Sequence, residues 1–289
     1  MLPGMAAKPR IAIVGAGNLG AALALSLHRA GYCIDSIVAR KASKSRDSSK
    51  KLAQQVNAKL LFDLQGSRAH VVWLCVPDAE IARVGTSVSA RFQEKGKIAL
   101  HSSGALTSDE LNPLRRKGAV VASVHPLMTF VRGSRSPLTG VPFALEGDAK
   151  AVRVARQIVN DLGGHAYAIR KKDKAAYHAW GAFTSPLFTA LLATSERVAM
   201  LAGVKQKEAR VRSIPILLQT LANYASFGAP GAFSGPVIRG DVDTIRRHLQ
   251  ALHNLRPARA AYVALVRAAL EYLPARNKNA ITKLLESSS

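Results

Sequence analysis

Three glycines near the start of the sequence have a spacing that suits phosphate binding. Gly15, Gly17 and Gly20 follow a short apolar run and open a segment rich in helix-forming residues. Gly15 permits a tight turn, Gly17 has no Cβ to keep a diphosphate from the backbone, and Gly20 allows the helix to pack closely. The amides of Asn18 and Leu19 would face the anion at the positive end of the helix dipole. The pattern predicts a dinucleotide site; a glycine turn that only packs is the alternative.

Basic residues at the end of the second predicted strand indicate which dinucleotide is bound. A protein that binds NAD places an acidic side chain there for the ribose 2′-hydroxyl, whereas this chain has Arg40, followed by Ser43 and Lys44. Arg40 can hold a 2′-phosphate with its fork of donors and stack on adenine. Asp35 lies inside the strand, too early in the sequence to serve. We therefore predict NADP(H) rather than NAD(H); a solvated basic turn is the alternative.

Three histidines could supply the proton that a hydride transfer requires. Hydride addition to a C=O or C=N bond leaves a heteroatom that takes up a proton, and histidine titrates in a suitable range. His178 is the first candidate for this acid, His125 the second and His101 the third. A core histidine satisfied by a neighbour explains His178 equally well, and a structural turn is the main competing explanation for His125.

Small polar residues at the ends of predicted strands could bind substrate. Ser103 and the Gly104 amide suit an anionic or carbonyl oxygen, whereas Ser102 is almost as well explained by capping or turn formation. Farther along the chain, Arg239 could pair with a substrate carboxylate, within one chain or across a dimer interface. Asp241 is better explained as a helix cap, and local pairing of Arg239 is equally open.

Alternating strands and helices must position these residues. Strands are predicted at 10–14, 32–39, 59–62, 71–76, 97–100, 120–124, 142–145 and 166–169. Helices are predicted at 21–30, 48–57, 79–91, 107–117 and 150–162. Asp78 is the expected cap of the third helix, and Thr107 with Glu110 forms a capping box for the fourth. The alternation predicts an α/β fold with a mostly parallel, doubly wound sheet, and ligands bind beyond the carboxyl ends of such strands.

The pattern changes near residue 170. Helices are predicted at 174–201, 207–227, 242–252 and 257–273, with a loop at 228–236. The sequence thus predicts a Rossmann NADP-binding domain over 8–170 and an all-α domain over 171–289. Two uncharged stretches, 175–195 and 213–238, contain too many polar or helix-breaking residues for lipid and are expected to be buried. Pro186 is expected to kink the helix predicted at 174–201.

Charge and cysteine content set the remaining expectations. The formal net charge is +23, but the basic residues are spread in short groups, and aromatic residues make up only 6% of the chain. A generally basic surface is therefore favoured over a nucleic-acid-binding protein, which stays the competing hypothesis. Cys33 and Cys75 lie in apolar strand-like runs, which indicates core packing in a reducing compartment. We expect a cytoplasmic protein without a metal site or membrane span.

Several motifs together resemble one known family. Residues 74–81, which include Val76 and Pro77, are similar to the segment that lines the nicotinamide side in the 6-phosphogluconate dehydrogenase-like superfamily. Residues 101–104, 125–130, 177–179 and 235–241 narrow the resemblance to bacterial Rossmann-like NADP oxidoreductases with a C-terminal helical domain of unknown function. Relatives include the deazaflavin-dependent NADP reductases and the pyrroline-carboxylate and ketopantoate reductases. The resemblance covers about 10–273.

This resemblance implies hydride transfer to or from a small carbonyl, imine or hydroxy compound, and a helical domain that commonly forms a homodimer. It places His178 on the helix where related hydroxyacid dehydrogenases keep a catalytic lysine. Where such relatives often continue with an Asn, this chain has Ser185 and Pro186. That departure leaves room for a non-catalytic NADP(H)-binding sensor or assembly protein. The resemblance names no substrate, because a fold does not establish a reaction.

Overall fold

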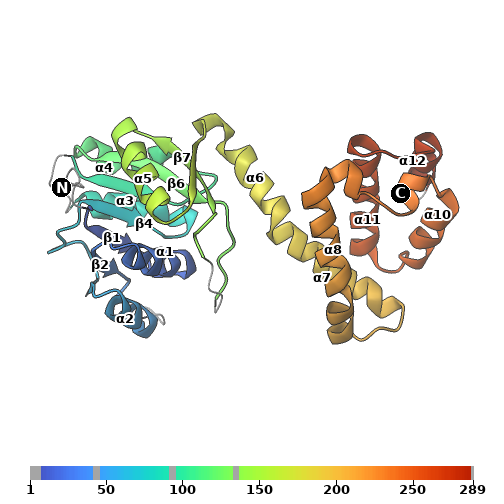
Figure 1. The fold of residues 1–289 in the computed structure, drawn as a ribbon, viewed down its shortest axis with the longest axis horizontal. Coiled ribbons are helices and arrows are strands. Elements are labelled where there is room, and N and C mark those ends of the chain that lie inside the picture. The colour runs from blue at the N-terminus through green and yellow to red at the C-terminus, as the bar shows by residue number, and fades with distance from the viewer. Residues whose placement is uncertain (1–7, 42–45, 91–95, 133–136, 288–289) are drawn as a thin grey trace. The chain divides into compact units, whose positions relative to one another are not determined.

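The chain divides into two compact units, residues 1–182 and 183–289. The computed structural model describes residues 8–41, 46–90, 96–132 and 137–287. All strands of the described chain lie in the first unit, and the second unit is helical (Figure 1). The last strand ends at Ala168, and the division between the units falls later, inside helix α6 (Lys174–Thr184).

One mixed sheet forms the centre of the first unit. Its strands are β1 Ile11–Val14, β2 Ile34–Val38, β3 Lys59–Leu61, β4 Val71–Leu74, β5 Ile98–His101, β6 Val120–Pro126, β7 Pro142–Gly147 and β8 His165–Ala168. Their order is β3-β2-β1-β4-β5-β6-β7-β8, and every neighbouring pair is parallel except β6 and β7. The order reverses between β1 and β4, so the carboxyl ends of these strands border the crevice where such sheets bind ligands. The predicted doubly wound α/β fold is confirmed.

Helices cover both faces of the sheet because its strands are apolar on both sides. In β1, Ile11 and Ile13 belong to one core cluster and Ala12 and Val14 to another, since successive side chains point to opposite faces. The first cluster takes side chains from α1 (Asn18–Arg29), α2 (Arg46–Gln55) and α5 (Ala149–Asp161). The second takes them from α3 (Asp78–Ser89) and α4 (Asn112–Arg116).

Two local predictions in the first unit differ from the structure. Cys33 is exposed, because β2 begins one residue later, so the prediction that both cysteines pack in the core is wrong for this one. The continuous helix predicted at 107–117 is a 3-10 turn, Ser108–Leu111, followed by α4. Thr107 does cap this turn, with its side chain accepting a hydrogen bond from the amide of Asp109. A second 3-10 turn, Lys171–Asp173, precedes α6.

Helices build the described part of the second unit. They are α7 Pro186–Leu201, α8 Gln206–Ala232, α9 Pro236–Arg239, α10 Val242–Ala251, α11 Arg256–Tyr272 and α12 Lys278–Glu286. Ile245 and Ile281 are fully buried at the centre of its core. The sequence pattern did not predict α12. Gly228, at φ 67°, kinks α8, and the helix then resumes as far as Ala232, so the predicted loop at 228–236 is shorter than expected.

Pro186 was predicted to kink a helix, and in the structure one helix ends before it and the next begins at it. Ser185 has non-helical angles (φ −125°, ψ −76°) between α6 and α7, and Pro186 occupies the first turn of α7. A proline is tolerated there because the amide it lacks has no partner inside the helix.

The two uncharged stretches are largely exposed, which contradicts the expectation that they are buried. No residue of α7 is buried, and in α8 only Ala209 is. Phe183, Leu218 and Phe227 are 72%, 62% and 68% exposed. These helices have outward faces that nothing in the described part of their unit covers. Among the described helices, none alone is long and apolar enough to cross a membrane, and one bent pair, 171–201 with 206–239, meets that test jointly.

Candidate functional site

The glycine turn between β1 and α1 has the geometry that the sequence predicted. Gly15 adopts φ +99°, and a Cβ on it would lie 2.5 Å from the carbonyl oxygen of Cys75. A Cβ on Gly20 would lie 1.9 Å from the carbonyl oxygen of Gly15, so only glycine lets α1 pack so closely. A Cβ on Gly17 would meet no atom within 4 Å. Gly17 therefore faces open space, where a ligand can approach the backbone.

A cavity of about 470 Å³ lies over this turn. Its walls come from 15–17, 38–40 at the end of β2, 62–64 after β3, 75–77 after β4, and one face of α3. The loop segments lie at or just after the carboxyl ends of strands, and α3 follows β4, as expected for the ligand crevice of a doubly wound sheet. The volume falls within the range of small-molecule sites.

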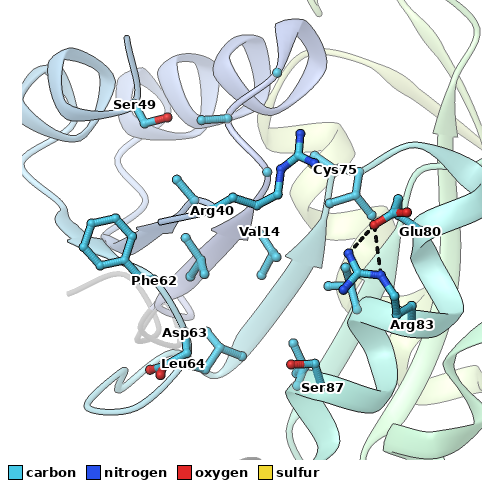
Figure 2. A pocket seen from close by; sticks show the side chains of 18 of the residues that line it. Val14, Arg40, Ser49, Phe62, Asp63, Leu64, Cys75, Glu80, Arg83 and Ser87 are labelled. Atoms are coloured by element: carbon cyan, nitrogen blue, oxygen red, sulfur yellow. Dashed lines mark hydrogen bonds and ion pairs between the residues drawn. The ribbon is translucent and has the colours of Figure 1, made fainter. Parts of the chain in front are cut away.

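Two arginines and two carboxylates, those of Asp63 and Glu80, set the charge of this cavity. Arg40 extends from the end of β2, while Glu80 and Arg83 project from α3 (Figure 2). Arg83 donates hydrogen bonds to the Glu80 carboxylate. The Arg83 guanidinium, and more weakly that of Arg40, holds the pKa of the Glu80 carboxyl below its ordinary value. The cavity thus holds two positive groups and two carboxylates, of which Glu80 pairs with Arg83 and Asp63 accepts a hydrogen bond from the amide of Gln65.

The other predicted cofactor residues divide into three groups. Val76 and Pro77 line the cavity. At the start of α1, the Asn18 side chain donates to the carbonyl oxygen of Phe130 (3.0 Å). Leu19 packs against the core, so it offers a ligand only its backbone. Ser43 and Lys44 lie outside the described residues.

Asp35, set aside as a cofactor residue by its early position, has another role. It is 7% exposed and accepts hydrogen bonds from the Ser67 hydroxyl (2.7 Å) and the Arg68 amide (3.1 Å). Its carboxylate is therefore taken up in holding the loop before β4. This leaves Arg40 as the charged side chain at the end of β2 that faces the cavity.

A second group of residues meets at Gly104, after β5. A Cβ on Gly104 would lie 2.6 Å from Cδ2 of His178 and 2.9 Å from Nε2 of His125. The two imidazole rings are edge to face, with centroids 5.9 Å apart. Only glycine fits between them. The structure thus brings together two predicted catalytic residues, from β6 and α6, and one predicted substrate residue.

The two histidines of this group differ in their surroundings. His125 is largely buried, and burial, with the charge of Lys174 next, lowers its pKa to about 4. It is therefore neutral at pH 7. Its Nδ1 lies 2.9 Å from the hydroxyl of Tyr177, whose pKa burial raises, so that the hydroxyl keeps its proton. His178, by contrast, is exposed to solvent on α6.

Lys174 is a site residue that the sequence analysis missed. Its side chain is fully buried, and Nζ donates to the carbonyl oxygen of Ser103 (3.0 Å) and to the hydroxyl of Ser123 (2.7 Å). Burial lowers its pKa to about 8, against the opposing effect of Glu146 and Asp78. Lys174 lies one helical turn before His178, and this i, i+4 spacing, which puts both on one face of α6, was a signal that could have revealed it.

Ser103 holds the loop that carries Gly104. It is 3% exposed; its hydroxyl donates to Asp78 (2.7 Å) and accepts from the amides of Ala105 and Leu106. Asp78 was predicted to cap α3, and this is wrong, because α3 has no side-chain cap and the carboxylate accepts from Ser103 instead. The Ser103 hydroxyl is thus fully engaged within the protein. Of the two substrate-binding residues predicted after β5, Gly104 is the one that adjoins the histidines.

His101 and Ser102 also have structural partners. Nδ1 of His101 accepts from the amide of Ser103 (3.1 Å), and Nε2 lies 2.9 Å from the carbonyl oxygen of Thr107. These partners fix one neutral tautomer with the proton on Nε2, in line with a pKa that burial lowers to about 4. The hydroxyl of Ser102 accepts from the indole of Trp73 (2.8 Å).

Arg239 and Asp241 belong to the second unit. Asp241 caps α10, as expected: its carboxylate accepts from the amide (3.0 Å) and the hydroxyl (2.7 Å) of Thr244. Arg239 ends α9 with an exposed side chain. The role of Arg239 in substrate binding stays a prediction.

Protein-family models and solved structures agree with the fold described above. Residues 5–126 match the Rossmann-like domain family, and residues 141–269 match DUF2520, a domain of unknown function. No curated protein matches the sequence. Three solved structures serve as examples.

The first is protein BF3122 from Bacteroides fragilis, described as an NADP oxidoreductase (21% identity, 90% of this chain, 97% of that one, TM-score 0.75). The second is protein TM1727 from Thermotoga maritima (23% identity, 96% and 98%, TM-score 0.68). The third is a reductive aminase from Aspergillus terreus in complex with NADPH and ethyl-5-oxohexanoate (15% identity, 96% and 99%, TM-score 0.67). At these identities the similarity establishes the fold.

Proposed function

We propose that this chain, which joins a Rossmann-like domain to a DUF2520 domain, is an NADP(H)-dependent oxidoreductase that acts on a small carbonyl, imine or hydroxy compound. The cavity over the glycine turn carries the proposal, because it combines a backbone open to a diphosphate with two arginine side chains. The fold shared with a reductive aminase that binds NADPH supports it. When bound, NADPH supplies the hydride.

The residues of the cavity suit the phosphate groups of NADP(H). The open face of Gly17 and the free amides at the start of α1 suit the diphosphate. Arg40 and Arg83 suit the 2′-phosphate, since a guanidinium binds phosphate through two parallel hydrogen bonds. Glu80 opposes the same phosphate by its charge, so NADP(H) binding requires that Arg83 be shared between the carboxylate and the phosphate. Val76 and Pro77 are assigned to the nicotinamide side.

The histidines at Gly104 suit the proton transfer. His178 is exposed, so it can take a proton from water and deliver it to the substrate heteroatom. His125 is neutral at pH 7 and acts as a hydrogen-bonding group rather than as an acid. Tyr177 holds the ring of His125 at Nδ1, and Nε2 lies beside Gly104, where it can orient a substrate oxygen or nitrogen.

Lys174 is assigned a positioning role in this scheme. Its ammonium ties the Ser103 carbonyl, on the loop after β5, to Ser123 of β6, and thereby holds Gly104 against both imidazoles. Its positive charge also disfavours protonation of His125, which keeps that ring neutral. A buried ammonium with two hydrogen bonds fixes this loop without touching the substrate.

The direct test is reduction of simple carbonyl compounds by the purified protein. NADPH oxidation would be followed with small ketones and 2-oxoacids, each with and without an added amine that forms an imine in solution. Turnover that depends on the carbonyl compound supports the proposal. Saturable NADPH binding without turnover of any compound would instead favour a cofactor sensor or assembly protein. Failure to bind either NADPH or NADH would refute the nucleotide-binding function altogether.

A homodimer through the helical unit is part of the same proposal. The apolar residues of α7 and α8 that face solvent in a single chain include Leu187, Ile214, Leu218 and Phe227. Burial of such a surface against a second copy is the ordinary way to remove it from water. Sedimentation should therefore give a dimer, and Leu218→Glu should give a monomer. Lys207→Glu, a charge change near the start of α8, should stay dimeric; a monomeric wild type would refute the dimer.

A further inference from the structure

The loop after β5 has one backbone amide that its own residues leave unpaired. The amide of Ser103 donates to Nδ1 of His101 (3.1 Å). The amides of Ala105 (3.2 Å) and Leu106 (2.8 Å) donate to the hydroxyl of Ser103. None of the described residues accepts a hydrogen bond from the amide of Gly104, although Gly104 is buried. Buried amides are almost always paired, so this one indicates a place for a ligand atom.

The peptide group that carries this amide is polarised from its other end. The carbonyl oxygen of Ser103 accepts hydrogen bonds from Nζ of Lys174 (3.0 Å) and from the hydroxyl of Ser123 (3.1 Å). A trans peptide points its carbonyl and its N–H in opposite directions, so the amide of Gly104 points away from the ammonium. Linked hydrogen bonds strengthen one another, and a charged donor gives the strongest bond. Gly104 therefore presents a strong backbone donor.

The two histidines beside Gly104 make this donor accessible to a ligand. The ring of His178 adjoins Gly104 and is exposed to solvent, so a molecule from solution can reach this point. Nδ1 of His125 lies against the Tyr177 hydroxyl (2.9 Å), which leaves Nε2 as the ring nitrogen beside Gly104. A ligand oxygen at this place can contact both the amide and the imidazole.

The local charge favours an oxygen that gains negative charge. Burial, and next to it the positive charge of Lys174, lower the pKa of His125. A cation held beside His125 is subject to the same field as a proton on its ring and is disfavoured, whereas an anion is stabilised. Asp78 and Glu146 oppose this field at Lys174, but both carboxylates accept hydrogen bonds from serine hydroxyls. The field at His125 is still that of a positive group.

We infer that the amide of Gly104, beside His125, forms an oxyanion hole, and that the substrate is a neutral aldehyde or ketone rather than a cationic iminium ion. This inference rests on the proposed reductase function. The carbonyl carbon receives the hydride that NADPH supplies, and the electron pair of the C=O π bond moves to the oxygen, which the hole stabilises. The alkoxide then takes a proton from the imidazolium of His178, which gives an alcohol and NADP⁺. Lys174 acts as a positioning residue that polarises the hole through Ser103.

The kinetic test compares cyclohexanone with an N-methyl cyclic iminium ion of the same ring size, at pH 7 and with the full chain and NADPH. The wild type should reduce the ketone with a kcat/KM roughly tenfold or more above that for the iminium ion. In Lys174→Met, kcat for the ketone should fall by roughly tenfold while KM changes little, because the lost stabilisation concerns charge that develops in the transition state. The iminium ion should lose much less. Ser123→Ala, which removes one of the two hydrogen bonds to the Ser103 carbonyl, should lower kcat for the ketone severalfold.

The matched control is Lys172→Met, an exposed lysine two residues earlier, which should keep the wild-type preference for the ketone. Equal losses for both substrates in Lys174→Met would mean that this lysine only holds the loop, and would overturn the inference. A wild type that prefers the iminium ion would also overturn it.

A second measurement needs neither cofactor nor turnover. Cyclohexanecarboxylate, whose charged oxygen stands in for the alkoxide, and the neutral cyclohexanecarboxamide are titrated against protein labelled with ¹⁵N-histidine. The ring signals, assigned with His125→Asn and His178→Ala, should respond to the carboxylate at roughly tenfold lower concentration than to the amide, and Lys174→Met should abolish this difference. Equal responses to both compounds, or none, would overturn the oxyanion hole. Selective carboxylate binding by a protein that binds no NADPH would support the hole and refute the reductase function.

Discussion

Replacing Lys174 by methionine tests the most unusual charge in the structure. The side chain is fully buried, and burial lowers its pKa from 10.5 to about 8. That difference corresponds to about 3 kcal/mol, by which the folded state disfavours the ammonium relative to the unfolded chain. The Lys174→Met variant removes this cost, but it also leaves the Ser123 hydroxyl without its donor, at about 1–3 kcal/mol, while the Ser103 carbonyl keeps a hydrogen bond from that hydroxyl. At pH 7 the net change in stability is therefore small.

The pH dependence separates these effects. Below about pH 8 the lysine is protonated in both states. Between about pH 8 and 10.5 the unfolded chain holds the proton that the folded chain has lost, so the wild type gains stability as the pH rises. The free energy of unfolding of the wild type, relative to that of Lys174→Met, should thus rise by roughly 2–3 kcal/mol between pH 7 and pH 10. The variant lacks the group and has no such gain.

Tryptophan fluorescence during urea unfolding provides the assay. Both tryptophans of the chain, Trp73 and Trp180, lie in the first unit, so their signal follows the unit that contains Lys174. Lys172→Met, an exposed lysine two residues earlier, is the control and should keep the wild-type pH dependence. If the stability difference between wild type and Lys174→Met is flat from pH 7 to pH 10, the lysine is not a buried ammonium with a depressed pKa, and the positioning role falls.

Three further substitutions test the cofactor and proton-transfer assignments. Arg40→Asp should weaken NADPH binding by roughly tenfold or more and change NADH binding much less, because a guanidinium–phosphate contact is replaced by repulsion. Equal losses of affinity for the two cofactors in fluorescence titrations would remove Arg40 from the 2′-phosphate site. Glu80→Gln releases Arg83 from its ion pair and should increase the affinity for NADPH severalfold relative to that for NADH. An unchanged ratio of the two affinities would mean that the Glu80 carboxylate does not face the phosphate. His178→Ala should lower turnover on an active carbonyl compound by roughly 100-fold or more with NADPH affinity preserved, and unchanged turnover would leave the proton donor elsewhere.

The sheet and the glycine turn were predictable because local sequence controls them. Continuous apolar runs such as 71–76 are typical of strands covered on both faces, and the observed β4 spans Val71–Leu74. Gly15 and Gly20 occupy positions where a Cβ would collide with backbone oxygens, so their spacing in the sequence reflects a steric requirement. Arg40 lies in the cavity because it ends a parallel strand beside the crevice.

The features that the sequence did not predict depend on contacts between distant segments. Lys174 is buried because α6 returns across the ends of β5 and β6, and apart from its i, i+4 spacing to His178 no local pattern distinguishes it from the exposed Lys171 and Lys172. Asp78 has the position of a helix cap, yet Ser103, 25 residues later, takes its carboxylate. The apolar stretches of α7 and α8 were expected to be buried because composition alone does not distinguish a core helix from one whose apolar face is exposed.

The central claim is that the backbone at the start of α1 receives the diphosphate of NADP(H). Gly17→Val tests it most directly, since the new Cβ would meet no atom of the protein within 4 Å and would occupy the space assigned to the ligand. NADPH should bind the wild type saturably and more tightly than NADH, and Gly17→Val should lose roughly tenfold or more in affinity while its unfolding midpoint stays near that of the wild type. Equal NADPH affinity for both proteins, or no binding by the wild type, would contradict the account.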